Sequence, residues 1–241
     1  MSVRGDVSRI KNDTFGFAKR VFRNAVAGRL KYGDKEDYNA GEYWKDRFQR
    51  HGFSMLAVGN EALTEAENRE IYEGAACVFL DIMRKENIDF QNIRVLEIGC
   101  GTGFYTELLN QLGVKNYVGL DVTDVFFPQL TKKYPEYMFV KKDITSDKVD
   151  GEYDLVVMID VIEHIVNKRK LGSAMENVKG CMANNCIFII SPIGDSRKCH
   201  LLFFMRYWSL EDIRRYFDGY ELRELVPFRG TYLLQIRKRA S

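Results

Sequence analysis

VLEIGCGTG, residues 95–103, is a short apolar run that ends in three glycines, each two positions after the one before it. The apolar and β-branched residues over 93–98 predict a buried strand, and the spacing over 106–112 predicts a helix. A glycine turn therefore joins a strand to a helix. Glycine tolerates positive φ and lets the backbone approach a ligand closely, while the first amides of the helix point into the adjoining crevice. The stretch predicts a nucleotide-type pocket.

The spacing of these glycines argues against a dinucleotide site. The dinucleotide fingerprint requires G-x-G-x-x-G or a final Ala, and counted from Gly101 the last position is Thr106. An acid also lies two residues before the first glycine, at Glu97. A carboxylate there would repel a pyrophosphate, whereas it would attract a cationic ligand and could order the loop.

The stretch resembles motif I of class I S-adenosylmethionine-dependent methyltransferases, E/D-x-G-x-G-x-G, which is matched at Glu97, Gly99, Gly101 and Gly103. Cys100 lies inside the same turn, and we include it among the residues that line the cofactor site. The resemblance covers about residues 65–237. It implies S-adenosylmethionine as cofactor and an α/β, Rossmann-like, seven-stranded, mostly parallel sheet of order 3-2-1-4-5-7-6 with the last strand antiparallel.

A second acid ends the next predicted strand, residues 117–121. Asp121 lies 24 residues after Glu97, near the interval of about 20 at which a strand-end acid meets ribose hydroxyls in nucleotide folds. The alternative is that Asp121 caps a helix predicted over 124–134. We expect Asp121 to bind the ribose and its neighbour Val122 to line the site.

A third acid follows the predicted strand 137–140. In the family that the sequence resembles, the acid at this place accepts a hydrogen bond from the adenine amino group and its apolar neighbour covers the ring. Asp143 and Ile144 match these positions. The alternative interpretation is a surface turn.

The fourth predicted strand, residues 153–160, is similar to the motif IV region, and Glu163 and His164 match its frequent "EH" pair. Its carboxyl end should lie beside the glycine turn, where open α/β sheets bind their ligands. Backbone groups from Met158 to Asp160 are therefore expected to reach the methionine part of the cofactor, and Asp160 is also expected to face the acceptor.

Three residues are candidates for handling the acceptor proton. His164 lies just beyond the fourth strand, Asp160 ends that strand, and His200 lies in a polar loop, residues 191–206, expected over the same crevice. His51 is a weaker candidate. For His164 the alternative is that it only orients its loop.

The flanking segments predict helices and a closing hairpin. Residues 1–62 are expected to form a helical cap, with an amphipathic helix over 14–30, a loop over 31–41 and a short helix from Tyr43 to near Gly52. Residues 63–241 are expected to form the cofactor-binding domain. Its first helix, over 65–86, has a capping box at Thr64 and Glu67 and an apolar face that includes Ile71. Residues 219–226 and 230–237 predict a hairpin.

Charge is distributed unevenly although the net charge is only +2. Residues 1–50 hold twelve Lys and Arg against seven Asp and Glu, residues 194–241 hold ten against six, and the middle is acidic. Basic flanks suit an anionic acceptor such as a sugar phosphate or a nucleic acid. Solvated helix faces explain the same charges without a partner.

The sequence indicates a cytoplasmic protein without a structural metal. The first residues lack an apolar signal core, and no run approaches the roughly 18 apolar residues of a membrane span. The five cysteines are an odd number and form no C-x-x-C, which fits a reducing compartment and argues against a zinc site.

Together these observations predict a methyltransferase that modifies a hydroxyl, or an amine, of a small polar metabolite such as a sugar or natural product. The cofactor's sulfonium makes its methyl group electrophilic, so the protein needs mainly to align the acceptor and exclude water. Two alternatives stay open, an RNA or other nucleic-acid methyltransferase and a regulatory module that binds the cofactor without catalysis. A homodimer contact through the cap is possible.

Overall fold

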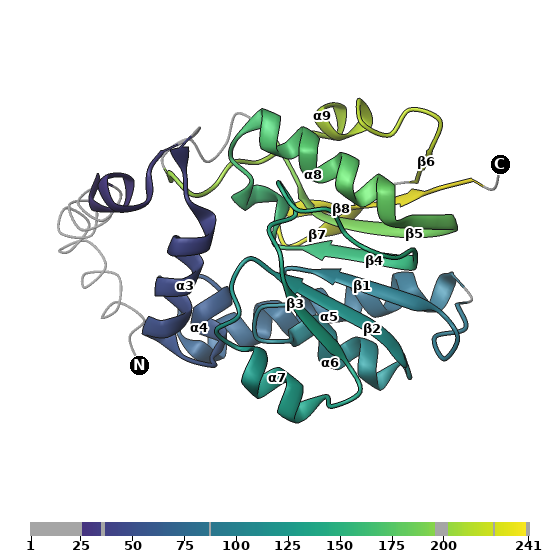
Figure 1. Cartoon of the computed structure of the whole chain (residues 1–241), viewed down its shortest axis with the longest axis horizontal. Helices are drawn as coiled ribbons and strands as arrows, with labels where there is room; N and C mark the ends of the chain where they lie inside the picture. Colours follow the sequence, from purple (N-terminus) through teal and green to yellow (C-terminus); the bar gives the residue numbers. More distant parts are fainter. Residues whose placement is uncertain (1–25, 35–36, 87, 196–201, 224, 240–241) are drawn as a thin grey trace, which may run out of the picture.

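A mixed sheet forms the centre of the chain (Figure 1). The computed structural model describes residues 26–34, 37–86, 88–195, 202–223 and 225–239. In chain order its strands are β1 (Arg94–Ile98), β2 (Asn116–Asp121), β3 (Met138–Lys141), β4 (Tyr153–Ile159), β5 (Met182–Ile193), β6 (Glu221–Leu222), β7 (Val226–Phe228) and β8 (Thr231–Arg237).

The predicted topology is confirmed. The strands follow the order β3-β2-β1-β4-β5-β8-β6, in which β1 to β5 are mutually parallel and β8 is antiparallel to β5. The predicted strand 219–226 is divided into β6 and β7, which makes eight strands rather than seven. Leu222 pairs with Ile236 whereas Val226 pairs with Leu233, so the register against β8 shifts by one residue between the two pieces.

Helices cover both faces of the sheet (Figure 1). Helices α8 and α9 lie on one face, α5, α6 and α7 lie on the other, and α3 and α4 lie beyond one end of the strands. Their bounds are α3 (Ala40–His51), α4 (Met55–Val58), α5 (Glu65–Lys85), α6 (Phe104–Gln111), α7 (Phe127–Lys133), α8 (Lys168–Cys181) and α9 (Leu210–Arg214), with a 3-10 turn η2 (Ile162–His164) after β4. Within the described part of the chain, no helix has both the length and the apolar character needed to cross a membrane.

Each face of the sheet has its own hydrophobic core, because parallel strands are apolar on both sides. Leu171 and Met175 of α8 belong to one core, and Phe79 of α5 and Leu109 of α6 belong to the other. All four side chains are fully buried. The sheet is thereby fixed from both sides, and the carboxyl ends of its strands are held at one edge.

Helix α5 begins where the sequence predicts. Thr64 accepts a hydrogen bond from the Glu67 backbone, and Glu67 accepts one from the Thr64 backbone, which confirms the capping box. The predicted apolar face is wrong at one position, since Ile71 is 38% exposed and Tyr72 is buried in its place. The Tyr72 hydroxyl donates to the Val58 carbonyl at 3.1 Å, so a bond to the cap turns this residue inward.

Two other helix boundaries differ from the sequence-based expectation. Helix α3 begins at Ala40, three residues earlier than expected, because the Asn39 side chain accepts from the Glu42 backbone and caps it. Helix α7 begins at Phe127 rather than near Asp124, with Pro128 in its first turn, where the absent N–H costs nothing. Of the helix predicted over 14–30, residues 14–25 lie outside the described residues, and residues 26–32 are helical.

Candidate active site

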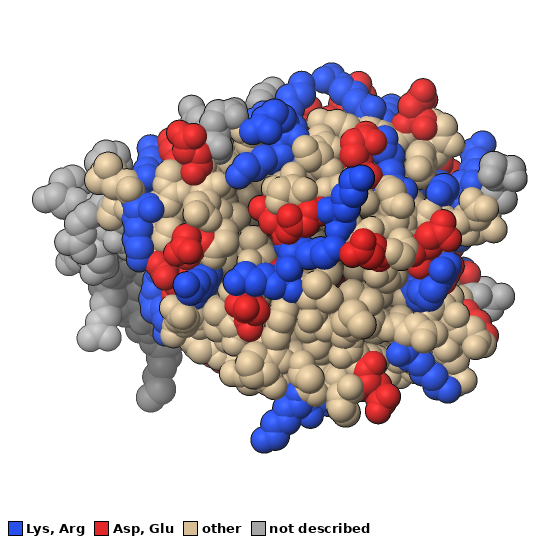
Figure 2. All heavy atoms as spheres, in the orientation of Figure 1, with Lys and Arg blue, Asp and Glu red and all other residues tan. Residues whose placement is uncertain are grey.

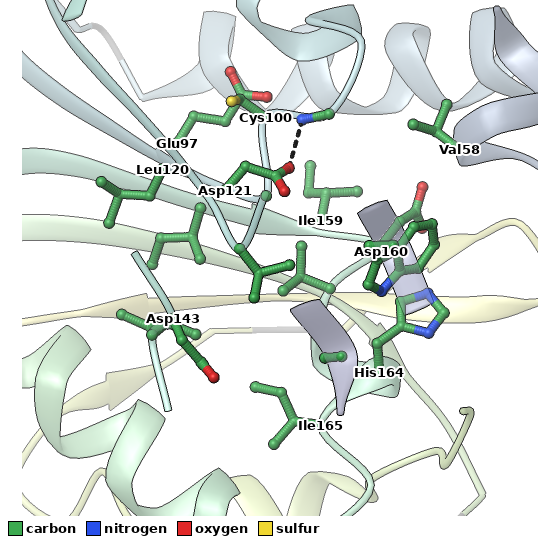
Figure 3. Close-up of a pocket in the computed structure, with 18 of the residues that line it drawn as sticks. Val58, Glu97, Cys100, Leu120, Asp121, Asp143, Ile159, Asp160, His164 and Ile165 are labelled. Carbon is green, nitrogen blue, oxygen red and sulfur yellow. Dashed lines mark hydrogen bonds between the residues drawn. The ribbon is translucent and has the colours of Figure 1, made fainter. Parts of the chain in front are cut away.

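One pocket opens at the carboxyl edge of the parallel strands, between the ends of β1, β2 and β4 and the cap formed by α3 and α4. Most of the residues predicted for the cofactor and the chemistry line it together. They are Glu97, Gly99, Cys100, Gly101, Asp121, Val122, Asp143, Ile144, Asp160 and His164. Figure 3 shows Asp121, Asp143, Asp160 and His164 arranged around the same opening.

Two predicted site residues are placed elsewhere, and a third is not described. Met158 lies one residue before the pocket-lining end of β4, and its side chain is fully buried in the core under α8. Ile159 and Asp160 line the pocket instead. Gly103 is the N-cap of α6 and packs against α7, where an added Cβ would lie 2.5 Å from Leu130. His200 lies outside the described residues.

The glycine turn approaches the loop after β4 closely enough to explain Gly99. This residue has φ +78°, and a Cβ built on it would lie 2.2 Å from Cγ2 of Val161. Both the backbone conformation and the space therefore exclude a side chain. The result is a turn whose backbone lines the pocket at Gly99, Cys100 and Gly101.

Glu97 is buried at the end of β1, directly beneath this turn. Its Oε2 accepts hydrogen bonds from the hydroxyls of Thr106, at 2.8 Å, and Tyr117, at 2.6 Å. Burial raises the pKa of Glu97 to about 7, although the two hydrogen bonds act to lower it. The same two bonds join β1 to α6 and β2, and in this way Glu97 can order the loop between them, as the sequence predicts.

Asp121 connects β2 to the glycine turn. Its Oδ2 accepts from the Gly101 backbone at 3.0 Å, the bond drawn in Figure 3, and its Oδ1 accepts from the Thr123 backbone at 3.0 Å. Burial raises its pKa to about 6. A carboxylate offers about four acceptor positions, so two remain, which suits a vicinal diol such as a ribose.

Asp143 and Ile144 lie in a turn that is fixed by side-chain hydrogen bonds. Asp143 Oδ1 accepts from the backbone and hydroxyl of Thr145, at 2.8 and 2.7 Å. Asn177 of α8 donates to the Ile144 carbonyl at 2.9 Å. The turn therefore presents one carboxylate and one apolar side chain to the pocket, as the predicted adenine contact requires.

Asp160 ends β4 in the left-handed region, with φ 58°, which is uncommon outside glycine and is found where surrounding contacts enforce it. Its backbone N–H donates to the Ser191 carbonyl at 3.0 Å, and Arg229 of the β7–β8 turn donates to Asp160 Oδ2 at 2.6 Å in an ion pair. The guanidinium also lies over the ring of Tyr72, 4.7 Å from its centroid. The Asp160 carboxylate is thus held at the pocket wall by a residue 69 positions away.

His164 is held as a neutral imidazole of defined tautomer. Its Nδ1 lies 2.9 Å from the Phe204 carbonyl, which can only accept, so Nδ1 carries the proton and Nε2 has a free lone pair. Burial lowers its pKa to about 4. Glu163 is also buried, and burial together with the neighbouring Asp160 raises its pKa.

Sequence reasoning missed the aromatic residues that complete the pocket. Trp44 of α3, Tyr72 of α5 and Tyr105 of α6 all line it. Within the described part of the chain, the buried Tyr105 hydroxyl has no hydrogen-bond partner. The position of Tyr105, two residues after the last glycine of the turn, is a usable signal, whereas nothing in the sequence brings Trp44 and Tyr72 to the site.

One buried cation joins the two helices of the cap. Arg47 of α3 is 4% exposed and donates to the carbonyls of Ala57, at 2.8 Å, Leu56, at 3.2 Å, and Gly59. Charged hydrogen bonds of this kind are the stronger ones. They join α3 to α4 and the loop that follows, so the two cap helices are fixed relative to each other.

Known sequences share the site-bearing part of the chain. A family model described as a methyltransferase domain matches residues 69–236. The chain is 30% identical over 131 residues to the putative methyltransferase 235L of Invertebrate iridescent virus 6, covering 49% of this chain and 48% of that protein. It is 28% identical over 118 residues to a ubiquinone biosynthesis O-methyltransferase of Rickettsia bellii, covering 47% and 48%. The chain thus spans about half the length of these relatives.

Solved structures share the fold. Magnesium protoporphyrin IX methyltransferase from Synechocystis PCC 6803 with bound S-adenosylmethionine superposes with a TM-score of 0.61 at 17% identity, over 85% of this chain and 99% of that one. The N-methyltransferase NodS from Bradyrhizobium japonicum gives 0.57 at 18%, over 70% and 97%. With the family model matched over most of the chain and two of the three motif I glycines, Gly99 and Gly101, at the pocket, the chain belongs to the class I methyltransferase domain family.

Proposed function

We propose that this chain transfers a methyl group from S-adenosylmethionine to a hydroxyl, or an amine, of a small-molecule acceptor. The observation that carries the proposal is that the neutral His164, whose Nε2 is unprotonated, lines the same pocket as the glycine turn and Asp121. The names of similar proteins, which include an O-methyltransferase and an N-methyltransferase, agree with both kinds of acceptor.

The pocket has groups suited to each part of the cofactor. Asp121, with two free acceptor positions, suits the ribose hydroxyls, and Val122 lies beside it. Asp143 and Ile144 suit the adenine amino group and ring. The bare backbone of the glycine turn leaves room for the amino-acid end, with Glu97 and Asp160 as nearby carboxylates for its positive charge.

The protein's part in the reaction is positioning and proton transfer. When bound, S-adenosylmethionine supplies an electrophilic methyl group whose bond to sulfur breaks as the bond to the acceptor forms, leaving S-adenosylhomocysteine. His164 Nε2 can take the proton that a hydroxyl acceptor loses, because burial keeps the imidazole neutral at physiological pH. The cap closes the pocket on the side of α3, and we propose that residues 37–62 exclude water and form the acceptor wall.

On the face in Figure 2, Lys and Arg side chains lie among Asp and Glu side chains. A phosphate backbone is bound by clustered positive charge, so the mixed charge of this face favours a small acceptor over a nucleic acid.

The test combines cofactor binding with product formation. Calorimetry should detect S-adenosylmethionine binding, and incubation with a broad set of hydroxyl and amine acceptors should produce S-adenosylhomocysteine. Substituting His164→Asn should lower kcat on hydroxyl acceptors by about 10²- to 10⁴-fold. The matched control is His51→Asn, whose ring pairs with Glu61 at the end of α3 outside the pocket and should leave kcat unchanged. Binding without product from any acceptor would instead indicate a non-catalytic cofactor-binding module.

A further inference from the structure

The wall of the pocket opposite the proposed cofactor groups is aromatic. It is formed by the cap and by the first turns of α5, and its members are the side chains Tyr38, Trp44, Phe48, Val58 and Tyr72. Four of these five are rings, and three of the rings come from the cap segment before α4. The acceptor therefore meets mainly flat, apolar surface on this side.

Trp44 is the member of this wall that lies beside the proposed base. Its ring centroid is 4.7 Å from that of His164, in an edge-on arrangement with an interplanar angle of 75°. Phe48 packs at 5.5 Å on one side, and the Arg47 guanidinium lies 5.1 Å from the indole. Trp44 is nevertheless only half-buried, so part of its ring remains available at the pocket.

Three of these side chains carry a polar group, namely the hydroxyls of Tyr38 and Tyr72 and the indole N–H of Trp44. The Tyr72 hydroxyl is bonded to the Val58 carbonyl, and within the described part of the chain the buried Tyr38 hydroxyl has no hydrogen-bond partner. A sugar carries a hydroxyl on nearly every carbon, and each hydroxyl that loses water needs a partner. A planar aromatic compound has one or two such groups and two apolar faces, which matches the surface.

We propose that the acceptor is a planar, hydroxylated aromatic compound whose ring packs against Trp44 and whose hydroxyl lies at His164 Nε2. The proposal rests on the proposed methyl transfer and narrows its acceptor class. It narrows the small polar metabolite, such as a sugar or natural product, that the sequence alone favoured to a compound with an aromatic ring. Trp44 is then a specificity-determining residue, because ring contacts favour aromatic partners over saturated ones of the same size.

Matched pairs of acceptors test the class. Catechol and 3,4-dihydroxybenzoate are compared with cis-1,2-cyclohexanediol and 3,4-dihydroxycyclohexanecarboxylate, first for binding to the S-adenosylhomocysteine complex by calorimetry and then for methylation. The aromatic member of each pair should bind about 2- to 12-fold more tightly, the range for one aromatic pair. Equal or tighter binding of the saturated members, or no binding of either aromatic compound at millimolar concentration, overturns the proposal. Aromatic binding without methylation supports it and refutes the proposed transfer instead.

Substitutions at Trp44 test its role in the same assay. Trp44→Leu should weaken aromatic acceptors about 2- to 12-fold, the range for one aromatic pair, and leave S-adenosylhomocysteine affinity within about twofold. Trp44→Phe should restore most of the loss. The matched control is Phe53→Leu, an exposed ring that packs on Phe126 in the same cap and does not line the pocket. If Trp44→Leu lowered the affinity for the aromatic acceptor and for S-adenosylhomocysteine equally, or lowered neither, the indole would not determine acceptor specificity.

Discussion

Gly99→Ala should destabilise the protein and displace the glycine turn, because the structure leaves no room for a methyl group there. The added Cβ would lie 2.2 Å from Val161 Cγ2, and the backbone has φ +78°. The two penalties have separate causes. One comes from the left-handed conformation, and the other comes from the contact with the loop that follows β4.

The magnitudes follow from these two terms. Placing an L-residue at positive φ costs about 1–2 kcal/mol, and forcing a methyl group into a packed contact costs about 1–3 kcal/mol. The expected loss of unfolding free energy is therefore about 2–5 kcal/mol. For a chain of 241 residues, at about 2–4 °C per kcal/mol, the melting temperature should fall by about 4–20 °C. Chemical denaturation gives the free energy, and calorimetric titration gives the accompanying loss of cofactor affinity.

Two further variants separate the terms. Gly219 also has positive φ, at +79°, but has nothing within 4 Å of an added Cβ, so Gly219→Ala should cost only the conformational term. Combining Gly99→Ala with Val161→Ala should remove the steric contact. In a double-mutant cycle, the double variant should regain the part of the unfolding free energy that this contact costs. The reasoning is refuted if Gly99→Ala costs no more than Gly219→Ala, or if the Val161 substitution shows no coupling with it.

Three other outcomes are expected. Burial raises the pKa of Glu97 to about 7, so stability should fall as pH rises from 4.5 through 7, and Glu97→Gln should remove this dependence in denaturation curves at pH 5 and pH 8. Burial lowers the pKa of His164 to about 4, so its contribution to stability should be lost as pH drops from 6.5 to 4, and His164→Asn should flatten that part of the profile. Gly74 lies inside α5 with open space around an added Cβ, so Gly74→Ala should raise the unfolding free energy by about 0.5–1 kcal/mol. Urea denaturation measures this change, and a decrease in the unfolding free energy would contradict the open space around Gly74.

The parts of the site that sequence could predict are those encoded locally. The turn from β1 to α6 follows from three glycines and the apolar run before them, and the acids at the ends of β2 and β4 follow from strand periodicity. Parallel strands present their carboxyl ends at one edge, so the pocket's location follows as well. Local signals also placed the start of α5 at its capping box.

The parts that sequence could not predict depend on pairings between distant residues. The sequence around Asp160 gives no sign that Arg229 will pair with it. Likewise, the sequence around His164 does not indicate that the Phe204 carbonyl will fix its tautomer. Periodicity placed Ile71 in the core, but a hydrogen bond from Tyr72 to the cap decided which face turns inward. Each of these contacts depends on a segment that is distant in the sequence, namely the terminal hairpin, the chain around Phe204 or the cap.

The buried acids of the pocket suggest why this site suits a positively charged ligand. Glu97 and Asp121 have pKa values raised by burial to about 7 and 6, which means that the fold disfavours their ionised forms. In the described part of the chain neither carboxylate has an ion pair with a cation, whereas Asp160 has Arg229. A cationic ligand near Glu97 would therefore stabilise the ionised carboxylate by electrostatic attraction, whereas a neutral ligand would not. We therefore expect binding of a sulfonium to release a proton from the pocket, in which case the motif I acid would contribute to ligand choice as well as to the shape of the turn.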